Sequence, residues 1–165
     1  MRNLKEKNLS KGNLDFRRWE LVASIVLLSS VAMPVQAGAQ VWSCLLFGSN
    51  AGKSFELPAR LSGYDARLRQ GLGYSSYRVI AQRETAVEDK HDNLLVAAGD
   101  IQVVLKNLSR AADGKYLVGL LFLQGTEQVM ETQARVSQGS PLFIRGPDWR
   151  DGQIIIVVMV PPSPR

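Results

Sequence analysis

Ile154–Val160 has the sequence IIIVVMV, and we expect the fold to be built around this stretch. The run contains no polar residue, so it lacks the alternation of a strand with one face in water. An uninterrupted apolar run of this length is typical of a strand that is covered on both faces. Pro161 and Pro162 end the run because proline has no backbone N–H to donate to a neighbouring strand. The sequence therefore predicts a central strand here.

The residues before this strand, Arg145–Gly152, have the sequence RGPDWRDG and are predicted to form a loop, which Pro141–Ile144 leads into. Tryptophan and arginine are enriched where proteins bind partners, and a loop at the end of a hairpin is a common place for function. Arg145, Trp149 and Arg150 are therefore candidate partner contacts. The alternative is that Trp149 folds back and covers the end of the sheet.

Several apolar or alternating segments precede this loop and predict further strands. Short turn sequences join them, including Asp113-Gly114, which favours a hairpin. Alternation is clearest in the last segment, where we expect the even-numbered residues from Met130 to Val136 to point inward. Strands joined by such short turns pair antiparallel. The segments are Ser75–Val87, Leu94–Ala98, Ile101–Leu108, Tyr116–Leu123 and Gln128–Val136.

One helix is predicted from Pro58 to Gln70. Proline suits the first turn of a helix, and Gly71 and Gly73 follow the segment as glycines often follow a helix end. Before the helix, Val41–Phe47 is almost wholly apolar and is predicted to be a buried first strand. Apolar residues recur along the helical segment at spacings of three and four, which places them on one face. They are Leu57, Leu61, Tyr64, Leu68 and Leu72.

These elements predict a strand, a helix and then a meander of strands. We expect an α+β fold in which one helix packs on one antiparallel sheet of about six to seven strands. The alternative is a β-sandwich with a helical insert. The domain is expected to span residues 40–161, with residues 162–165 as a tail. A segment of that length is enough for one domain with one core.

The N-terminal 39 residues are predicted to be a secretory signal peptide. Six lysines and arginines precede the uncharged segment Leu21–Met33, and small residues around Ala37 and Ala39 follow Pro34. We expect cleavage after Ala39, with Ala37 as the second choice. The alternative is a retained membrane anchor over residues 21–35, although a span needs about 20 apolar residues. Both interpretations place the domain outside the cytoplasm, either periplasmic or secreted, or anchored there.

The basic character of the chain belongs largely to this leader. The formal net charge is +5 for the whole chain, of which residues 1–20 carry +3 and residues 40–165 carry +2. The domain therefore gives no compositional reason to expect nucleic-acid binding, which requires a clustered basic face. Cys44 is the only cysteine, so no disulfide can form within the chain, and we expect it to be buried.

The segment Gly48–Ser54, GSNAGKS, resembles a phosphate-binding P-loop. The P-loop pattern has four residues between its glycines, and this segment has three. A helix should also begin at the Lys-Ser pair, but Pro58 disfavours helical structure in the residue before it. An ordinary loop is therefore expected, and no nucleotide is predicted to bind.

No catalytic residue, metal ligand or cofactor site is predicted. His91 is the only histidine and lies in the charged segment 88–93, which suggests a solvated turn. The domain supplies one histidine and one cysteine, whereas a zinc site takes several such ligands. No G-x-S-x-G motif occurs, and no two carboxylates have a sequence reason to face each other.

Three segments carry a resemblance to a known group of proteins. They are GYSSYR at Gly73–Arg78, SPLFIRGP at Ser140–Pro147 and DGQIII at Asp151–Ile156. With the helix before them, they resemble small exported bacterial proteins that share a GYSSYR-like strand and a closing hairpin of the IRGP…DGQII type. The resemblance implies export and brings no activity with it.

A non-enzymatic binding or scaffolding domain of the cell envelope is therefore the expected function, with an envelope protein as its partner. The alternative is an envelope hydrolase that acts on cell-wall or carbohydrate material. A deep pocket with convergent carboxylates would favour the hydrolase. An exposed apolar or aromatic patch on a flat surface would favour the binding domain.

Overall fold

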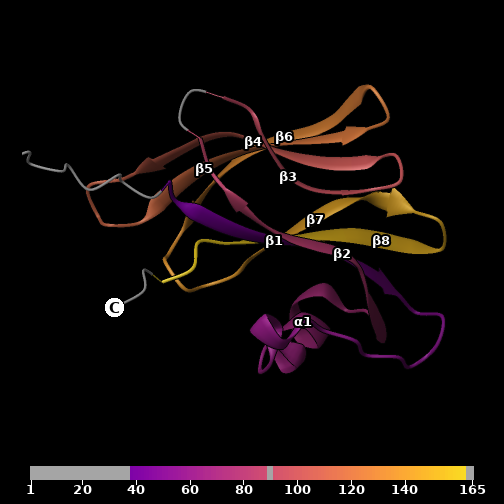
Figure 1. Cartoon of the computed structure of the whole chain (residues 1–165). Helices are drawn as coiled ribbons and strands as arrows, with labels where there is room; N and C mark the ends of the chain where they lie inside the picture. The colour runs from indigo at the N-terminus through magenta and orange to yellow at the C-terminus, as the bar shows by residue number, and fades with distance from the viewer. Residues whose placement is uncertain (1–37, 89–90, 163–165) are drawn as a thin grey trace, which may run out of the picture. The chain divides into compact units, whose positions relative to one another are not determined.

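The computed structural model describes residues 38–88 and 91–162, which fold into two antiparallel sheets of four strands each and one short helix. Figure 1 shows them as layers, with the second sheet above the first and the helix α1 (Asp65–Leu72) below. The first sheet has the order β2 (Ser76–Ala86), β1 (Gln40–Ser49), β8 (Gly152–Met159), β7 (Leu142–Trp149). The second has the order β3 (Asn93–Ala98), β4 (Ile101–Arg110), β5 (Tyr116–Gln124), β6 (Glu127–Val136).

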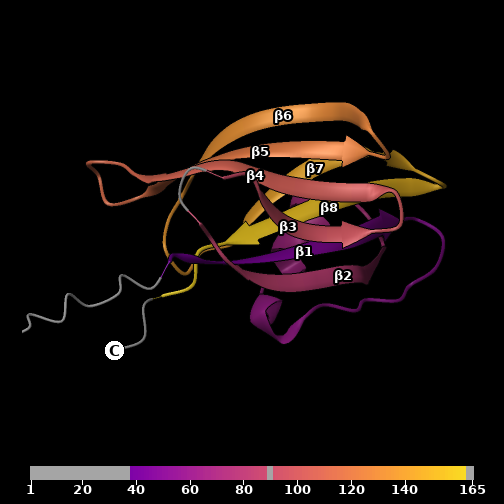
Figure 2. The same ribbon diagram turned by 45° about the horizontal axis from the view of Figure 1, so that its top comes forward.

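The apolar run Ile154–Val160 supplies most of β8, and the prediction of a central strand is confirmed. β8 pairs with β1 on one side and with β7 on the other, as Figure 2 shows. Every residue of the run is buried. Successive side chains point to opposite faces of a strand, so Ile154 and Ile156 enter the core between the sheets. Ile155 enters a second core between the first sheet and α1, which explains why the run has no polar alternation.

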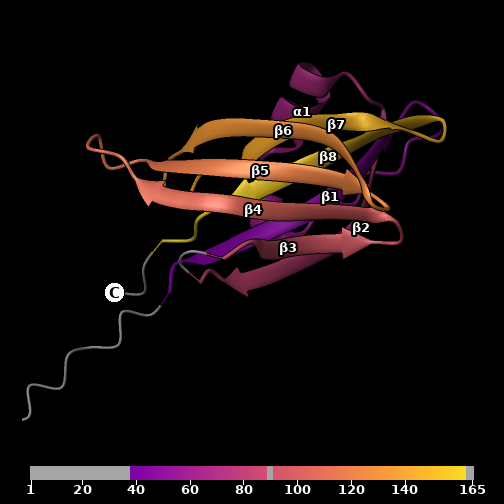
Figure 3. The ribbon, with the colours of Figure 1, turned by 90° about the horizontal axis from the view of Figure 1, so that it is seen from above.

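The expectation of an α+β fold with one sheet of six to seven strands is wrong, because the described chain is mostly strand and forms two sheets of four. The chain leaves the first sheet at the end of β2 and forms β3 to β6 as a separate meander. It then returns to the first sheet as β7 and β8, and β8 pairs with β1. Figure 3 looks down on that meander, with the strands of the first sheet running beneath it. The two sheets bury their facing apolar sides against each other. The alternative, a β-sandwich with a helical insert, describes these layers better.

The predicted helix from Pro58 to Gln70 is also corrected. The segment forms a short 3-10 turn, η1 (Ala59–Leu61), and then α1, with Gly63 between them at φ +90°. That backbone conformation favours glycine and interrupts a helix. Leu61 and Leu68 are nevertheless buried against the first sheet, as the apolar spacing predicts. The hydroxyl of Tyr77 donates a hydrogen bond to the carbonyl of Leu68 and fastens α1 to β2.

The predicted loop Arg145–Gly152 is mostly strand. β7 continues to Trp149, and only Arg150 and Asp151 lie between it and β8. Pro147 is tolerated because β7 is an edge strand and its register with β8 shifts between Arg145 and Asp148. The other strands match their predicted segments closely, and the even-numbered residues of β6 from Met130 to Val136 point inward as predicted.

The signal peptide and the alternative anchor over residues 21–35 lie outside the described residues, apart from Gly38 and Ala39. Within the described part, no helix is both long enough and apolar enough to cross a bilayer. Ala39 already takes part in the fold, because the backbone N–H of Val87 donates a 2.9 Å hydrogen bond to its carbonyl.

Candidate functional site

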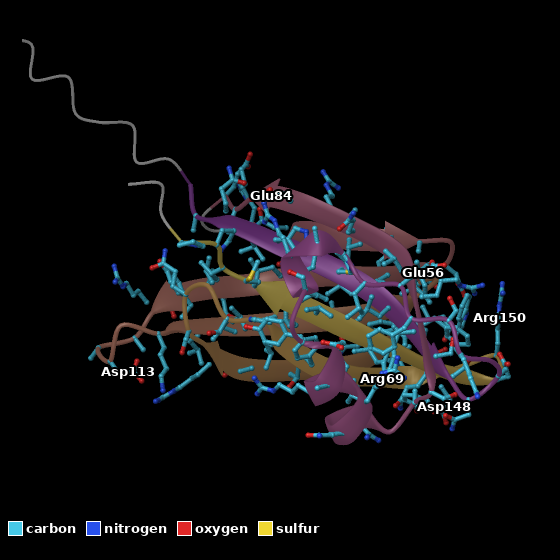
Figure 4. All side chains as sticks on the ribbon, turned by 90° about the horizontal axis from the view of Figure 1, so that it is seen from below. Glu56, Arg69, Glu84, Asp113, Asp148 and Arg150 are labelled. Carbon is cyan, nitrogen blue, oxygen red and sulfur yellow. The ribbon has the colours of Figure 1, made fainter. Side chains whose placement is uncertain are left out.

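An open cleft of about 500 Å³ lies at the end of the first sheet where β1 ends and β2 begins. We call it the turn-end cleft, because the β7–β8 turn and the loop after β1 form its other walls. Figure 4 shows Glu56 and Arg150 at this end of the molecule and Asp113 at the opposite end. The lining residues are Phe47, Ser49, Ala51, Ser54, Glu56, Ser76, Arg78, Arg150 and Asp151.

Strand register places four of these side chains together. Ser49 of β1 lies opposite Ser76 of β2, and Phe47 lies opposite Arg78. Residues two apart on a strand share a face, so the two serines and the Phe47–Arg78 pair project to the same side of the sheet. Phe47 contributes to the core between the sheets, which identifies this side as the inner one.

The hydroxyls of Ser49 and Ser76 form no hydrogen bond with the described residues. The two residues are only 4% and 8% exposed, yet neither hydroxyl has a hydrogen-bond partner among the described residues. Every fully buried polar side-chain atom in this part of the chain does have a partner. The two hydroxyl oxygens must therefore reach the cleft, where they can donate or accept hydrogen bonds.

Two arginines flank these hydroxyls, and each lies over an aromatic ring. The guanidinium carbon of Arg78 is 5.6 Å from the ring centroid of Phe47, and that of Arg150 is 4.1 Å from the ring centroid of Trp149. The two rings meet edge to face at 5.4 Å. Within the described residues, neither guanidinium forms an ion pair with a carboxylate. We call these four side chains the Arg–aromatic row.

The P-loop-like segment forms one wall of the cleft in a different way from a P-loop. Gly48 and Ser49 belong to β1, and the next helical turn begins only at Ala59. Side-chain bonds hold the loop, since the Ser75 N–H donates to Oδ1 of Asn50 and the Ser75 hydroxyl donates to the Gly52 carbonyl. Further along, Ser54 and Glu56 exchange backbone hydrogen bonds with Tyr77, which fixes the loop beside β2.

Two carboxylates also line the cleft. Glu56 comes from the loop after β1, and Asp151 comes from the β7–β8 turn. Both side chains are exposed, and the hydroxyl of Ser54 lies 3.5 Å from Oε1 of Glu56. The cleft therefore combines two cations, two anions and free hydroxyls, a set that can hold a polar ligand by hydrogen bonds and charge.

The three predicted partner contacts, Arg145, Trp149 and Arg150, do not all lie together in the structure. Arg150 lines the turn-end cleft, and Trp149 lies behind it, half-buried against Phe47 and the core. Arg145 lies elsewhere: its guanidinium donates to the carbonyls of Gly71 and Leu72 at 3.2 and 3.1 Å, at the end of α1. Whether these residues contact a partner stays a prediction.

Sequence reasoning missed Ser49, Ser76 and Arg78. The alternation in Ser76-Tyr77-Arg78 does place Ser76 and Arg78 on one face of a strand. It does not identify Ser49 as the residue opposite Ser76, because that pairing depends on the register between β1 and β2. Composition alone gives no reason to single out two serines.

The other chemically active residues lie away from this cleft. Cys44 is fully buried, and burial raises the pKa of its thiol to about 12. His91 is exposed, as predicted, and borders a smaller cavity of about 170 Å³ together with Glu88 and Asn93. Within residues 38–88 and 91–162, no three His, Cys, Asp or Glu side chains gather closely enough to hold a metal ion.

The chain matches no protein-family model, no curated protein and no solved structure. What the turn-end cleft binds must therefore be inferred from its own donors, acceptors and charges.

Proposed function

We propose that this protein is a non-enzymatic binding domain of the cell envelope, periplasmic or secreted, and that it contacts its ligand through the turn-end cleft. The observation that carries the proposal is the pair of free hydroxyls on Ser49 and Ser76 between two arginines without ion pairs. Polar groups at a concave site that the protein itself leaves unpaired are typical of a place where a ligand supplies the partners. The leader-like segment Leu21–Met33 supports export.

A photo-crosslinking amino acid at the cleft tests this proposal. Ala51 is exposed and lines the cleft, so a crosslinker at this position should capture the bound partner in cells. Ala112 is the matched control, because it is exposed on the β4–β5 turn beside Asp113 at the other end of the molecule. We expect a product from position 51 that is absent from position 112 and that is lost when Arg78→Ala is added. Identical products from both positions would contradict a role for the cleft.

The envelope hydrolase remains a second candidate because Glu56 and Asp151 line the same cleft. Hydrolysis of a glycosidic bond uses a pair of carboxyl groups, one of them as a general acid. Glu56→Gln and Asp151→Asn each remove one acid with little change in shape. Release of soluble sugar from cell-wall material by the unmodified protein, lost in both variants, would establish the enzyme and displace the binding domain.

A further inference from the structure

We propose that the turn-end cleft recognises an oxyanion, the carboxylate or phosphate group of its ligand, through Arg78, Arg150, Ser49 and Ser76. This inference rests on the proposed binding function and specifies the chemistry of the ligand. The four residues come from β1, β2 and the β7–β8 turn and line one cavity. The cavity between α1 and β7 is lined by one arginine, Arg67, and the cavity beside His91 by none.

The donor set is the first argument. A guanidinium carries five N–H donors in a planar fork and no acceptor, and each hydroxyl can add one donor. Forks of this kind bind carboxylate and phosphate oxygens in pairs, and such charged hydrogen bonds are among the stronger ones in proteins. Arg78 and Arg150 have no carboxylate partner among the described residues that would already occupy their donors.

The Arg–aromatic row is the second argument. A guanidinium that lies over a ring uses its flat face for that contact and keeps its N–H edges available. Arg78 and Arg150 lie over Phe47 and Trp149 at 5.6 and 4.1 Å from the ring centroids, and the two rings meet edge to face. Donors that are placed before the ligand arrives lose less conformational entropy on binding.

The backbone at Arg150 is the third argument. Arg150 has φ +55°, and it is the only residue other than glycine with a positive φ in the described chain. Glycine and asparagine adopt this conformation at lower cost. A conformation that costs energy at a turn beside a cleft supports a role for the arginine side chain in ligand contact.

The carboxylates of Glu56 and Asp151 repel an anion in the cleft, so removing one of them should strengthen anion binding. Both carboxylates line the cleft, so the four charged lining residues sum to zero. A ligand oxyanion is attracted by the arginines and repelled by the acids across the same space. Asp151→Asn removes one repulsion and should strengthen anion binding, an effect that a purely structural role for these residues does not predict.

The experiment titrates the purified full chain with inorganic phosphate and, separately, with acetate, at constant ionic strength adjusted with chloride. Binding is followed by NMR shifts of the Ser49 and Ser76 amides and the arginine side-chain N–H groups. We expect saturable shifts with at least one probe. Phosphate alone would identify a phosphate-bearing ligand, acetate alone a carboxylate-bearing one, and both together the shared oxyanion chemistry.

The variants separate recognition from folding. Arg150→Asn suits the backbone of the turn, and we expect it to weaken anion binding about tenfold. The double variant with Arg78→Gln should bind the anion at least as weakly. Asp151→Asn should strengthen binding about threefold. Arg67→Gln removes an exposed arginine on α1 that does not line the cleft, and we expect it to leave anion binding unchanged.

Absence of saturable shifts with both anions would overturn the inference, and so would equal binding by Arg67→Gln and Arg150→Asn. If either result were found but the crosslinker at Ala51 still captured a partner, the proposed binding function would stand and only the oxyanion inference would fail. If the crosslinker also captured no partner, both proposals would fail.

Discussion

Trp149 connects the turn-end cleft to the core. Its ring meets Phe47 edge to face and also lies under the guanidinium of Arg150. It packs against the cluster of buried residues between the sheets. The residue therefore has a structural role whether or not a partner also touches it.

We expect Trp149→Ala to lower the free energy of unfolding by about 2 kcal/mol, since it removes a half-buried aromatic side chain and an aromatic pair. Urea denaturation followed by circular dichroism measures the change. An unchanged unfolding free energy together with lost partner capture would show that Trp149 serves the contact alone.

Cys44 gives the fold a dependence on alkaline pH. Burial in the folded protein raises the pKa of this thiol from 9.0 to about 12. Between these values the unfolded chain loses the proton and the folded chain keeps it, so the folded state becomes less favoured as pH rises from 9 to 12. Below pH 9 both states hold the proton, and this residue adds no pH dependence.

We expect the unfolding free energy to fall by about 1 kcal/mol more between pH 8 and pH 10 in the unmodified protein than in Cys44→Ala. Urea titrations under reducing conditions at both pH values measure the difference, and the comparison cancels the other titrating groups. Equal losses in both proteins would show that the thiol ionises as easily folded as unfolded.

Among the elements, β8 is buried along most of its length. Ile156 is 1% exposed and lies between Leu45 of β1 and Ile144 of β7. We expect Ile156→Asp to abolish folding, because an unpaired buried carboxylate costs several kcal/mol, comparable to the whole stability of a domain. Val129→Asp is the control, since Val129 is 41% exposed on β6. A soluble Ile156→Asp protein with a cooperative thermal transition would contradict the central position of β8.

α1 depends on the edge strand β7 through Arg145. Its guanidinium donates to the carbonyls of Gly71 and Leu72, and a cation at the C-terminal end of a helix also interacts favourably with the helix dipole. We expect Arg145→Ala to cost about 1 kcal/mol and to speed amide hydrogen exchange in residues 68–73. Arg67→Ala on the same helix should leave that exchange unchanged. Slower or equal exchange in Arg145→Ala would mean that the contact does not hold the helix.

Most strands could be predicted from the sequence, but their division into two sheets could not. Alternation in β6 and the apolar run in β8 fix which residues are buried, because side-chain direction is local. Which strand lies next to β1 depends on pairing across more than a hundred residues, and no local pattern encodes that choice.

The residues of the candidate site could likewise be predicted only where a local sequence pattern marks them. Composition singled out Trp149 and Arg150 near the turn, because glycine, proline and charged residues mark such places. The extent of β7 was missed because Gly146-Pro147 is typical of a loop, although an edge strand tolerates both at a shift in register. Ser49 and Ser76 needed the structure, since only the β1–β2 register brings them together.

At the scale of the whole molecule, the residues that join the predicted signal peptide to the domain contribute to stability. Val87 is buried, and its N–H donates to the carbonyl of Ala39. Cleavage after Ala39 would remove this acceptor, whereas cleavage after Ala37 would leave it in place. We expect a chain beginning at Gly38 to be about 1 kcal/mol more stable than one beginning at Gln40, measured by urea denaturation of the two products.

If the protein is exported and cleaved as predicted, N-terminal sequencing of the mature product should give Gln40 as its first residue. A mature product that still contains Leu21–Met33 would support the anchor instead. Equal stability of the two shorter chains would show that water replaces the carbonyl of Ala39 without cost.

The course of β1 also determines how the domain presents its cleft when it is held by one end. The strand begins at Gln40 and ends at Ser49 in the cleft, about 30 Å away at the usual rise per residue. Trp42 pairs with Met159, so the chain leaves the domain at the end where it enters. A tether attached at either end of the described domain, at Gly38 or at Pro162, therefore displays the cleft at the far end. Immobilisation of residues 38–162 on a sensor surface through either of these ends should leave the cleft open to a ligand in solution.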